Sequence, residues 1–164
     1  MSHSFSRQCV EIVTECPAMD ITSLDLTKEF PRSPRDISIA GYVVAARCVD
    51  KCRAVLAETN GEYHSGCPLD EVWLDFVGIK YSAFKKFIAT GADDAAVSEW
   101  VAKKAKQKSR SAVIAWNNRM RDMRIGSMSM KLQKFLEDYI PANLPENKPP
   151  YVWFDVYDIE ERRI

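Results

Sequence analysis

The sequence has no long apolar run, no excess of charge of either sign and very little histidine. Lys and Arg together number 23, and so do Asp and Glu, so the formal net charge is zero. A neutral chain has no overall field that attracts nucleic acid or a membrane surface. No stretch approaches the roughly 20 apolar residues that a membrane-spanning helix needs. We therefore expect no membrane association and no nucleic-acid partner.

Disulfides and secretion signals are also missing from the sequence. The chain has five cysteines, an odd number at irregular spacing, which does not fit a disulfide framework. Cys48 and Cys52 are four residues apart within a helical pattern, so they share a helix face as thiols. The first twenty residues contain acidic side chains and lack the apolar core of a signal peptide. These features predict a reduced protein of the cytoplasm.

Helical periodicity dominates the chain between residues 33 and 140. Apolar residues recur there at i, i+3 and i+4 spacing, in stretches bounded by capping residues, Pro and Gly. The first helix is expected to begin at Ser33, with Asp36 completing a capping box, and to run to about Ala57. Later helices are expected to open at Pro68, before Phe84, after Asp93 or Asp94, after Ser109, and before Leu132, with Pro141 stopping the last.

We therefore expect a mainly α fold, a compact array of about six helices with a short C-terminal strand or extended segment. Residues 1–24 are expected to be poorly ordered or extended, 25–142 to form the helical domain, and 143–164 to be a Pro-rich linker and a strand packed on that domain. Tyr151–Tyr157 alternates aromatic and β-branched residues, which is typical of a strand. A lone strand must pair, either with residues 10–13 or with a second subunit in a homodimer.

The core is expected to come from the apolar faces of these helices. Its predicted members are Ile39, Val43, Val49, Leu69, Trp73, Phe76, Phe87, Trp100, Val113, Trp116, Met120, Leu132, Phe135 and Leu136.

Several short motifs resemble a known family. They are Leu26-Thr27-Lys28, Pro31-Arg32-Ser33-Pro34-Arg35, Gly41-Tyr42, Asp50-Lys51-Cys52-Arg53-Ala54, Gly61-Glu62-Tyr63-His64, Cys67-Pro68-Leu69-Asp70, Trp116-Asn117 and Trp153-Phe154-Asp155. Together they resemble an uncharacterised bacterial family, the domain of unknown function number 5069, over about residues 24–162. The resemblance implies a small bacterial cytoplasmic protein with no assigned activity and supplies no catalytic residue. It directs attention to Asp50 and to the loop around His64.

The loop at residues 61–68 holds the richest set of reactive side chains. His64 is the only histidine outside the N-terminal tail, and an imidazole titrates near neutrality, which suits general acid–base catalysis. Cys67 is a candidate nucleophile just before a helix start. An enzyme would pair His64 with Cys67, Glu62 or Asp50. The simpler alternative is that His64 and Cys67 are structural.

Glu62, His64 and Cys67 are also weak candidates for a metal site. A structural zinc ion needs four ligands, and the spacing here matches no zinc-finger or ribbon motif. Asp50 or Asp70 would have to complete the set through the fold. We therefore predict no metal, and the sequence names no cofactor: it has no phosphate-binding loop, no dinucleotide-binding glycine pattern and no Cys-x-x-Cys.

A cationic helix face precedes the same loop. Arg47 and Arg53 are each three residues from Asp50, so a solvated, ion-paired face is the simpler interpretation. The functional alternative is a small-molecule or anion-binding module with a pocket between the first helix and the 61–68 loop. Its predicted ligand-binding residues are Arg47, Lys51, Arg53, Tyr63, His64 and Asn117.

A second basic region runs from Lys103 to Arg124, where eight Lys and Arg residues face one acid, Asp122. Such a run could contact a phosphate backbone. Ser109 interrupts it as a helix cap, and no base-stacking aromatic cluster accompanies it. We therefore expect a solvated or dimer-facing surface there.

Overall fold

The computed structural model describes residues 24–106 and 108–164, and every structural statement below concerns these residues. Within them the chain is mainly helical, with seven α-helices, one 3-10 turn and only an isolated β-bridge, which confirms the predicted fold class. The expected N-terminal segment and its strand-like residues 10–13 lie outside the described part. The helices are α1 (Ala45–Leu56), α2 (Pro68–Val77), α3 (Tyr81–Ile88), α4 (Asp94–Lys104), α5 (Arg110–Arg121), α6 (Met130–Asn143) and α7 (Trp153–Glu160), with the 3-10 turn η1 (Ile125–Ser127) between α5 and α6.

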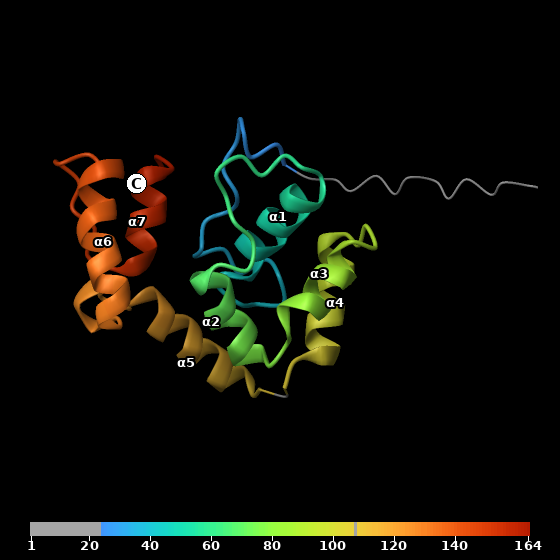
Figure 1. Ribbon diagram of the computed structural model, residues 1–164. Coiled ribbons are helices and arrows are strands. Elements are labelled where there is room, and N and C mark those ends of the chain that lie inside the picture. The colour runs from blue at the N-terminus through green and yellow to red at the C-terminus, as the bar shows by residue number, and fades with distance from the viewer. Residues whose placement is uncertain (1–23, 107) are drawn as a thin grey trace, which may run out of the picture.

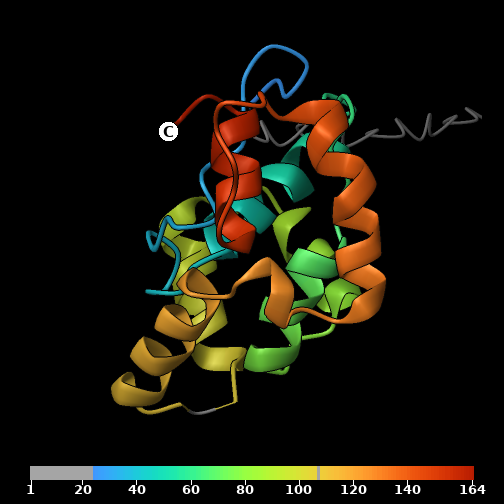
Figure 2. The same cartoon turned by 90° about the vertical axis from the view of Figure 1, so that its left-hand side faces the viewer.

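Helix α1 lies at the centre of the fold. It contacts α2 and α3, and its residues from Ala45 to Cys52 are all buried. In Figure 1, α1 to α4 form one group, α6 and α7 lie at the other end, and α5 runs beneath from the first group to the second. The turned view shows α7 in front of α1 (Figure 2), and Arg47 of α1 pairs with Glu161, the residue that follows α7. A helix buried all round cannot hydrate its polar residues, so each charge on α1 needs a protein partner.

Aromatic residues fill the space between α1 and its neighbours. Trp73 meets Phe84 edge-on at 5.6 Å between ring centroids, and Phe76 stacks on Trp116 at 4.6 Å. Most predicted core residues are buried or partly buried. Phe135 is the exception, because it is 59% exposed on the outward face of α6, where it stacks on Tyr139 at 5.3 Å.

Local capping sets most helix ends where the sequence predicts them. Asp93 caps α4 by accepting the amide of Ala96 at 2.8 Å, and Ser109 caps α5 by accepting the amide of Ala112 at 3.2 Å. Gly78 ends α2 with φ at 70°, a conformation that glycine adopts without strain. The predicted stop of α6 is wrong by two residues: Pro141 lies inside its last turn and the helix continues to Asn143.

The predicted start of the first helix is wrong, because α1 begins at Ala45 rather than at Ser33. Ser33 accepts the amide of Arg35 at 3.1 Å, and Asp36 accepts the amide of Ser38 at 2.7 Å. Side chains that cap a helix can stabilise isolated turns equally well. The pattern at residues 33–36 therefore marks turns, and the helix starts twelve residues after Ser33.

The loop at residues 37–44 is the strained connection into α1. Ala40, Gly41 and Val44 all have positive φ, at 50°, 77° and 71°. A positive φ at a β-branched residue such as Val44 is rare, and it persists only where the surroundings enforce it. The amide of Val44 donates to the carbonyl of Pro34 at 2.8 Å, which is one such restraint.

The predicted C-terminal strand is also wrong, because residues from Trp153 onward form helix α7. Only Val152 pairs in a strand-like way, in an antiparallel bridge with Arg124. Trp153, Val156 and Ile159 are buried at helical spacing. In the sequence, the alternating aromatic residues of the same segment hide this helical pattern. The dimer hypothesis was based on an unpaired C-terminal strand, and this segment is a helix instead. No described helix is both long and apolar enough to cross a membrane.

Candidate functional site

The first group of predicted site residues forms a buried clasp between α1 and the C-terminus. Arg47 donates two hydrogen bonds to Glu161, at 2.9 and 2.6 Å, and both side chains are almost fully buried. The hydroxyl of Tyr63 donates to the same carboxylate at 2.9 Å. The guanidinium of Arg47 also lies over the rings of Tyr63 and Tyr157, at 5.6 and 4.8 Å. We call Arg47, Tyr63, Tyr157 and Glu161 the Arg47 clasp.

The electrostatics of the clasp keep Glu161 ionised. Burial pushes the pKa of Glu161 up, but the hydrogen bonds and charge of Arg47, with a contribution from Arg163, lower it below its ordinary value. Burial and the neighbouring carboxylate raise the pKa of Tyr63, so this phenol stays a proton donor. The opposite charges of the clasp therefore compensate each other inside the fold, and their contacts hold α7 and the chain end against α1.

Lys51 belongs to a second buried group, one turn further along α1. Its ammonium lies 2.7 Å from an oxygen of Asp70 and donates to the sulfur of Cys67 at 3.1 Å. Asp70 also accepts the thiol of Cys48 at 3.0 Å and the amide of Gly66 at 2.9 Å. We call Cys48, Lys51, Cys67 and Asp70 the Lys51 cluster. It ties the 61–68 loop to α1.

Burial and neighbouring charges have opposite effects on the pKa of Lys51. Desolvation alone lowers the pKa of Lys51, but Asp70 and the sulfur groups around it offset that effect, and the pKa is raised above its ordinary value. A buried ammonium is therefore retained beside a cysteine that is partly exposed.

Arg53 and Asp50 belong to a third group, which fastens α4. Arg53 donates to Asp94 at 2.7 Å and to the carbonyl of Ala92 at 2.7 Å. Arg32 bridges both carboxylates, Asp50 at 2.7 Å and Asp94 at 2.8 Å. Asp50 is thus paired with a guanidinium and does not reach the 61–68 loop as a partner for His64.

His64 and Glu62 are exposed, and no hydrogen bond or ion pair of the described chain involves either side chain. The structure therefore does not assemble the predicted pairing of His64 with Cys67, Glu62 or Asp50. Among the described residues, no three His, Cys, Asp or Glu side chains are grouped closely enough to hold a metal ion. Glu62, His64 and Cys67 do not form a ligand set there.

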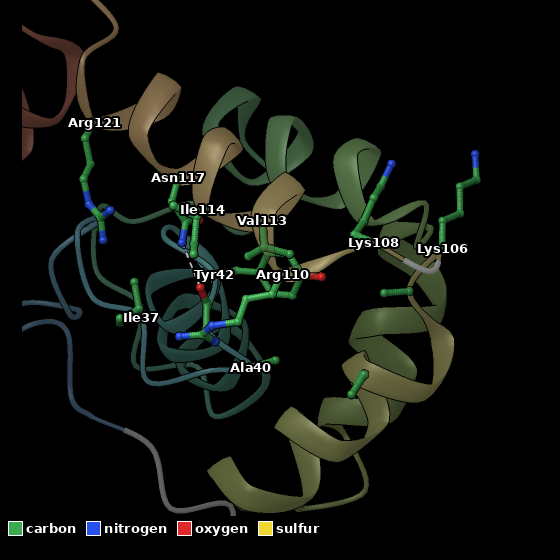
Figure 3. A pocket seen from close by; sticks show the side chains of 13 residues that line it. Ile37, Ala40, Tyr42, Lys106, Lys108, Arg110, Val113, Ile114, Asn117 and Arg121 are labelled. Atoms are coloured by element: carbon green, nitrogen blue, oxygen red, sulfur yellow. Dashed lines mark hydrogen bonds between the residues drawn. The ribbon is translucent and has the colours of Figure 1, made fainter.

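A pocket of about 450 Å³ opens elsewhere, beside α5. It lies between one face of α5, the end of α4 and the strained 37–44 loop (Figure 3). We call it the α5 pocket. Its lining residues are Ile37, Ala40, Gly41, Tyr42, Ala102, Ala105, Lys106, Lys108, Arg110, Val113, Ile114, Asn117 and Arg121.

Four of these residues are basic and none is acidic. Figure 3 shows Arg110 and Arg121 reaching from opposite ends of α5 toward the loop that carries Ile37, whereas Lys106 and Lys108 extend away from it. No described carboxylate pairs with any of the four. Two guanidinium groups therefore face an open space without a charge partner in the described chain.

Asn117 is the one predicted ligand-binding residue that lines this pocket, but its amide is already used. Its oxygen accepts the amide of Val43 at 3.2 Å, and its nitrogen donates to the carbonyl of Gly41 at 2.9 Å. The side chain is buried, and it holds the strained loop against α5. Asn117 therefore shapes the wall of the pocket.

A second pocket, of about 420 Å³, lies near the chain end between the 143–148 segment and the end of α7. It also contains basic residues, but Glu160 lies among them, and Lys148 donates to the main-chain carbonyl of Ile164 at 2.9 Å. Its charges are mixed, so it has less net attraction for an anion than the α5 pocket.

Sequence reasoning missed two features of these sites. Glu161, the partner of Arg47, lies in a tail without any motif, and only the need of a buried guanidinium for a carboxylate points to it. Arg110 and Arg121 could have been found, because three helical turns separate them and both share a face of α5 with Ile114 and Asn117.

Together these features define a mainly helical protein with an ion-paired centre and a cationic pocket on one side. The family model described as Domain of unknown function (DUF5069) matches residues 28–163, so the chain belongs to that family. This confirms the family resemblance of the motifs. A search of curated proteins found no significant match.

Proposed function

We propose that this chain is a cytoplasmic anion-binding module whose site is the α5 pocket. The observation that carries the proposal is the pair of guanidinium groups, Arg110 and Arg121, which face a cavity and have no carboxylate partner in the described chain. An uncompensated cation at a concave surface attracts anionic ligands.

The lining indicates the chemistry of the ligand. Arginine binds carboxylate or phosphate through two parallel hydrogen bonds, which gives direction as well as charge. Between the two arginines lie Ile37 and Ile114, which are 49% and 46% exposed. The arginines are three turns apart on α5, about 16 Å along the helix axis. This arrangement suits a small organic phosphate or carboxylate with an apolar body.

The site differs from the one expected from sequence. Arg47, Lys51 and Arg53 each have a carboxylate within 2.7 Å, so their charges are compensated inside the fold. A ligand there would have to displace a buried ion pair, which leaves a desolvated charge behind. No such cost opposes binding at Arg110 or Arg121.

Isothermal titration calorimetry at low salt tests the proposal with inorganic phosphate, phenyl phosphate and a long-chain dicarboxylate as probes. We expect at least one probe to bind the wild-type chain. Replacing Arg110 or Arg121 by Gln should weaken binding about tenfold, because a hydrogen bond to a charged group contributes about 1.5 kcal/mol.

The matched control is Arg119→Gln, which removes the same charge from the same helix outside the pocket lining. Its affinity should stay within about twofold of wild type, since a distant exposed charge is screened by salt. Equal weakening by Arg119→Gln and Arg121→Gln would indicate diffuse charge attraction and contradict a defined site. Absence of binding by all three probes would contradict the proposed ligand class.

A further inference from the structure

The three cysteines of the described chain are reduced but occupy different environments. Cys48 and Cys52 are fully buried on α1, whereas Cys67 is partly exposed at the start of α2. Burial, followed by the charge of Asp70, raises the pKa of Cys48 well above its ordinary value. Burial also raises the pKa of Cys52 to about 11. Both buried thiols are therefore poor nucleophiles.

Cys67 differs because an ammonium group reaches its sulfur. Lys51 is 3% exposed and lies 3.1 Å from the sulfur, held there by its 2.7 Å ion pair with Asp70. Asp70 is fixed in turn by Cys48 and by the amide of Gly66. An ammonium has three donors, and these contacts use two of them.

We propose that Cys67 is a peroxide-reactive thiol and that Lys51 is its positioning residue. The thiol first gives its proton to solvent, and the thiolate sulfur then attacks one oxygen of hydrogen peroxide, so that an S–O bond forms and the O–O bond breaks. The sulfur loses two electrons and becomes a sulfenic acid, and the second oxygen leaves as hydroxide, which takes a proton from solvent to become water.

Lys51 contributes by electrostatics. Negative charge moves from the sulfur to the departing oxygen during this displacement, and a fixed ammonium 3.1 Å from the sulfur stabilises that charge. The placement is independent of the α5 pocket, so this inference and the proposed anion site can fail separately. It assigns to Cys67 a chemistry that does not involve His64.

The experiment is peptide-resolved labelling of the full chain. The protein is exposed to hydrogen peroxide and dimedone at pH 7, once folded and once in urea, and each cysteine is quantified by mass spectrometry. Cys67 should label about tenfold faster in the folded than in the unfolded protein. Cys48 and Cys52 should label much more slowly when folded, and they are internal controls in the same sample.

A folded rate for Cys67 at or below its unfolded rate would overturn the proposal, because the fold would then protect the thiol rather than activate it. Lys51→Met tests the positioning role, provided that circular dichroism shows a folded variant, and should remove the enhancement. If Lys51→Met does not fold, Asp70→Asn is used, which frees Lys51 from its partner. Unchanged Cys67 rates in a folded variant of either kind would remove Lys51 from the mechanism.

Discussion

The ion-paired centre and the α5 pocket both concentrate basic side chains, but they use them in opposite ways. At the centre, Arg47 and Lys51 are almost completely buried and lie 2.6 and 2.7 Å from carboxylates. In the pocket, Arg110 and Arg121 face a cavity, and no described carboxylate pairs with them. A buried cation has to be compensated within the fold, whereas a cation that faces a cavity is hydrated and stays free to pair with an anionic ligand. Partners and burial, more than the density of cations, separate the compensated charges of the centre from the uncompensated charges of the pocket.

This contrast predicts opposite sensitivities. Removing a charge from the centre should cost stability, because its partner remains desolvated. Removing a charge from the pocket should cost binding and leave the free energy of unfolding within about 0.5 kcal/mol.

The largest expected effect is that of Arg47→Met. It leaves Glu161 as a buried carboxylate without its bidentate partner, and breaking such a pair costs about 3–5 kcal/mol. The free energy of unfolding, measured by urea denaturation, should fall by that amount. The control is Lys103→Met, which removes one partner of an exposed pair, 3.7 Å from Glu99, and should change stability by less than about 0.5 kcal/mol.

A loss below about 1 kcal/mol for Arg47→Met would mean that Arg163, which also pairs with Glu161, or water compensates this carboxylate, and the contrast between the two regions would weaken. The double variant Arg47→Met, Glu161→Gln sharpens the result. Because it removes both charges together, it should recover part of the stability lost in the single variant.

A smaller effect is expected from Asn117→Ala, which acts on both regions at once. The variant loses the hydrogen bonds to Val43 and Gly41 and leaves one buried and one partly buried main-chain group unpaired, at a cost of about 2 kcal/mol. It should also weaken anion binding, since the 37–44 loop is no longer held against α5. Denaturation and calorimetry measure the two effects. Ser82→Ala, at an exposed position of α3 outside the pocket lining, should change neither.

The smallest effect per group is the loss of ion pairs in acid. Burial raises the pKa of Glu161 and of Asp94, but their arginine partners lower both below the ordinary values of 4.5 and 3.8. A depressed folded pKa contributes stability that is present above the unfolded pKa and is lost as the pH falls through the folded value. Melting temperature should therefore fall as the pH drops from 5 to below 3. Arg47→Met should show a shallower fall, and an equal slope would exclude Glu161 as a contributor.

The helix caps were predictable because their chemistry is local. Asp93, Ser109 and Gly78 act within a few residues of their own position, so their types and spacing were sufficient. Ser33 and Asp36 make the same kind of local hydrogen bond, but in turns rather than at a helix start. Whether such a segment forms a turn or a helix depends on contacts with other parts of the fold. The C-terminal helix was missed because its aromatic alternation and its helical stripe coexist over only eight residues.

The site was predictable only in part. The sequence singled out Arg47, Lys51 and the 61–68 loop as parts of a ligand pocket, and the structure places both cations in buried ion pairs. The sequence also offered the interpretation of an ion-paired face, but with Asp50 as the partner. The carboxylates that pair with Arg47 and Lys51 are Glu161 and Asp70, which lie 114 and 19 residues away along the chain. No local sequence pattern indicates which of two residues so far apart in the chain will form an ion pair.

The sequence by itself determined that this chain is mainly helical, where most of its helices begin, and which family it belongs to, because those properties depend on local periodicity, capping and short motifs. Only the tertiary structure decided which charges are compensated and which face an open cavity. Compensation depends on burial and on contacts between segments far apart in the chain. The same arginine side chain thus holds the fold together at position 47 and remains available at position 121.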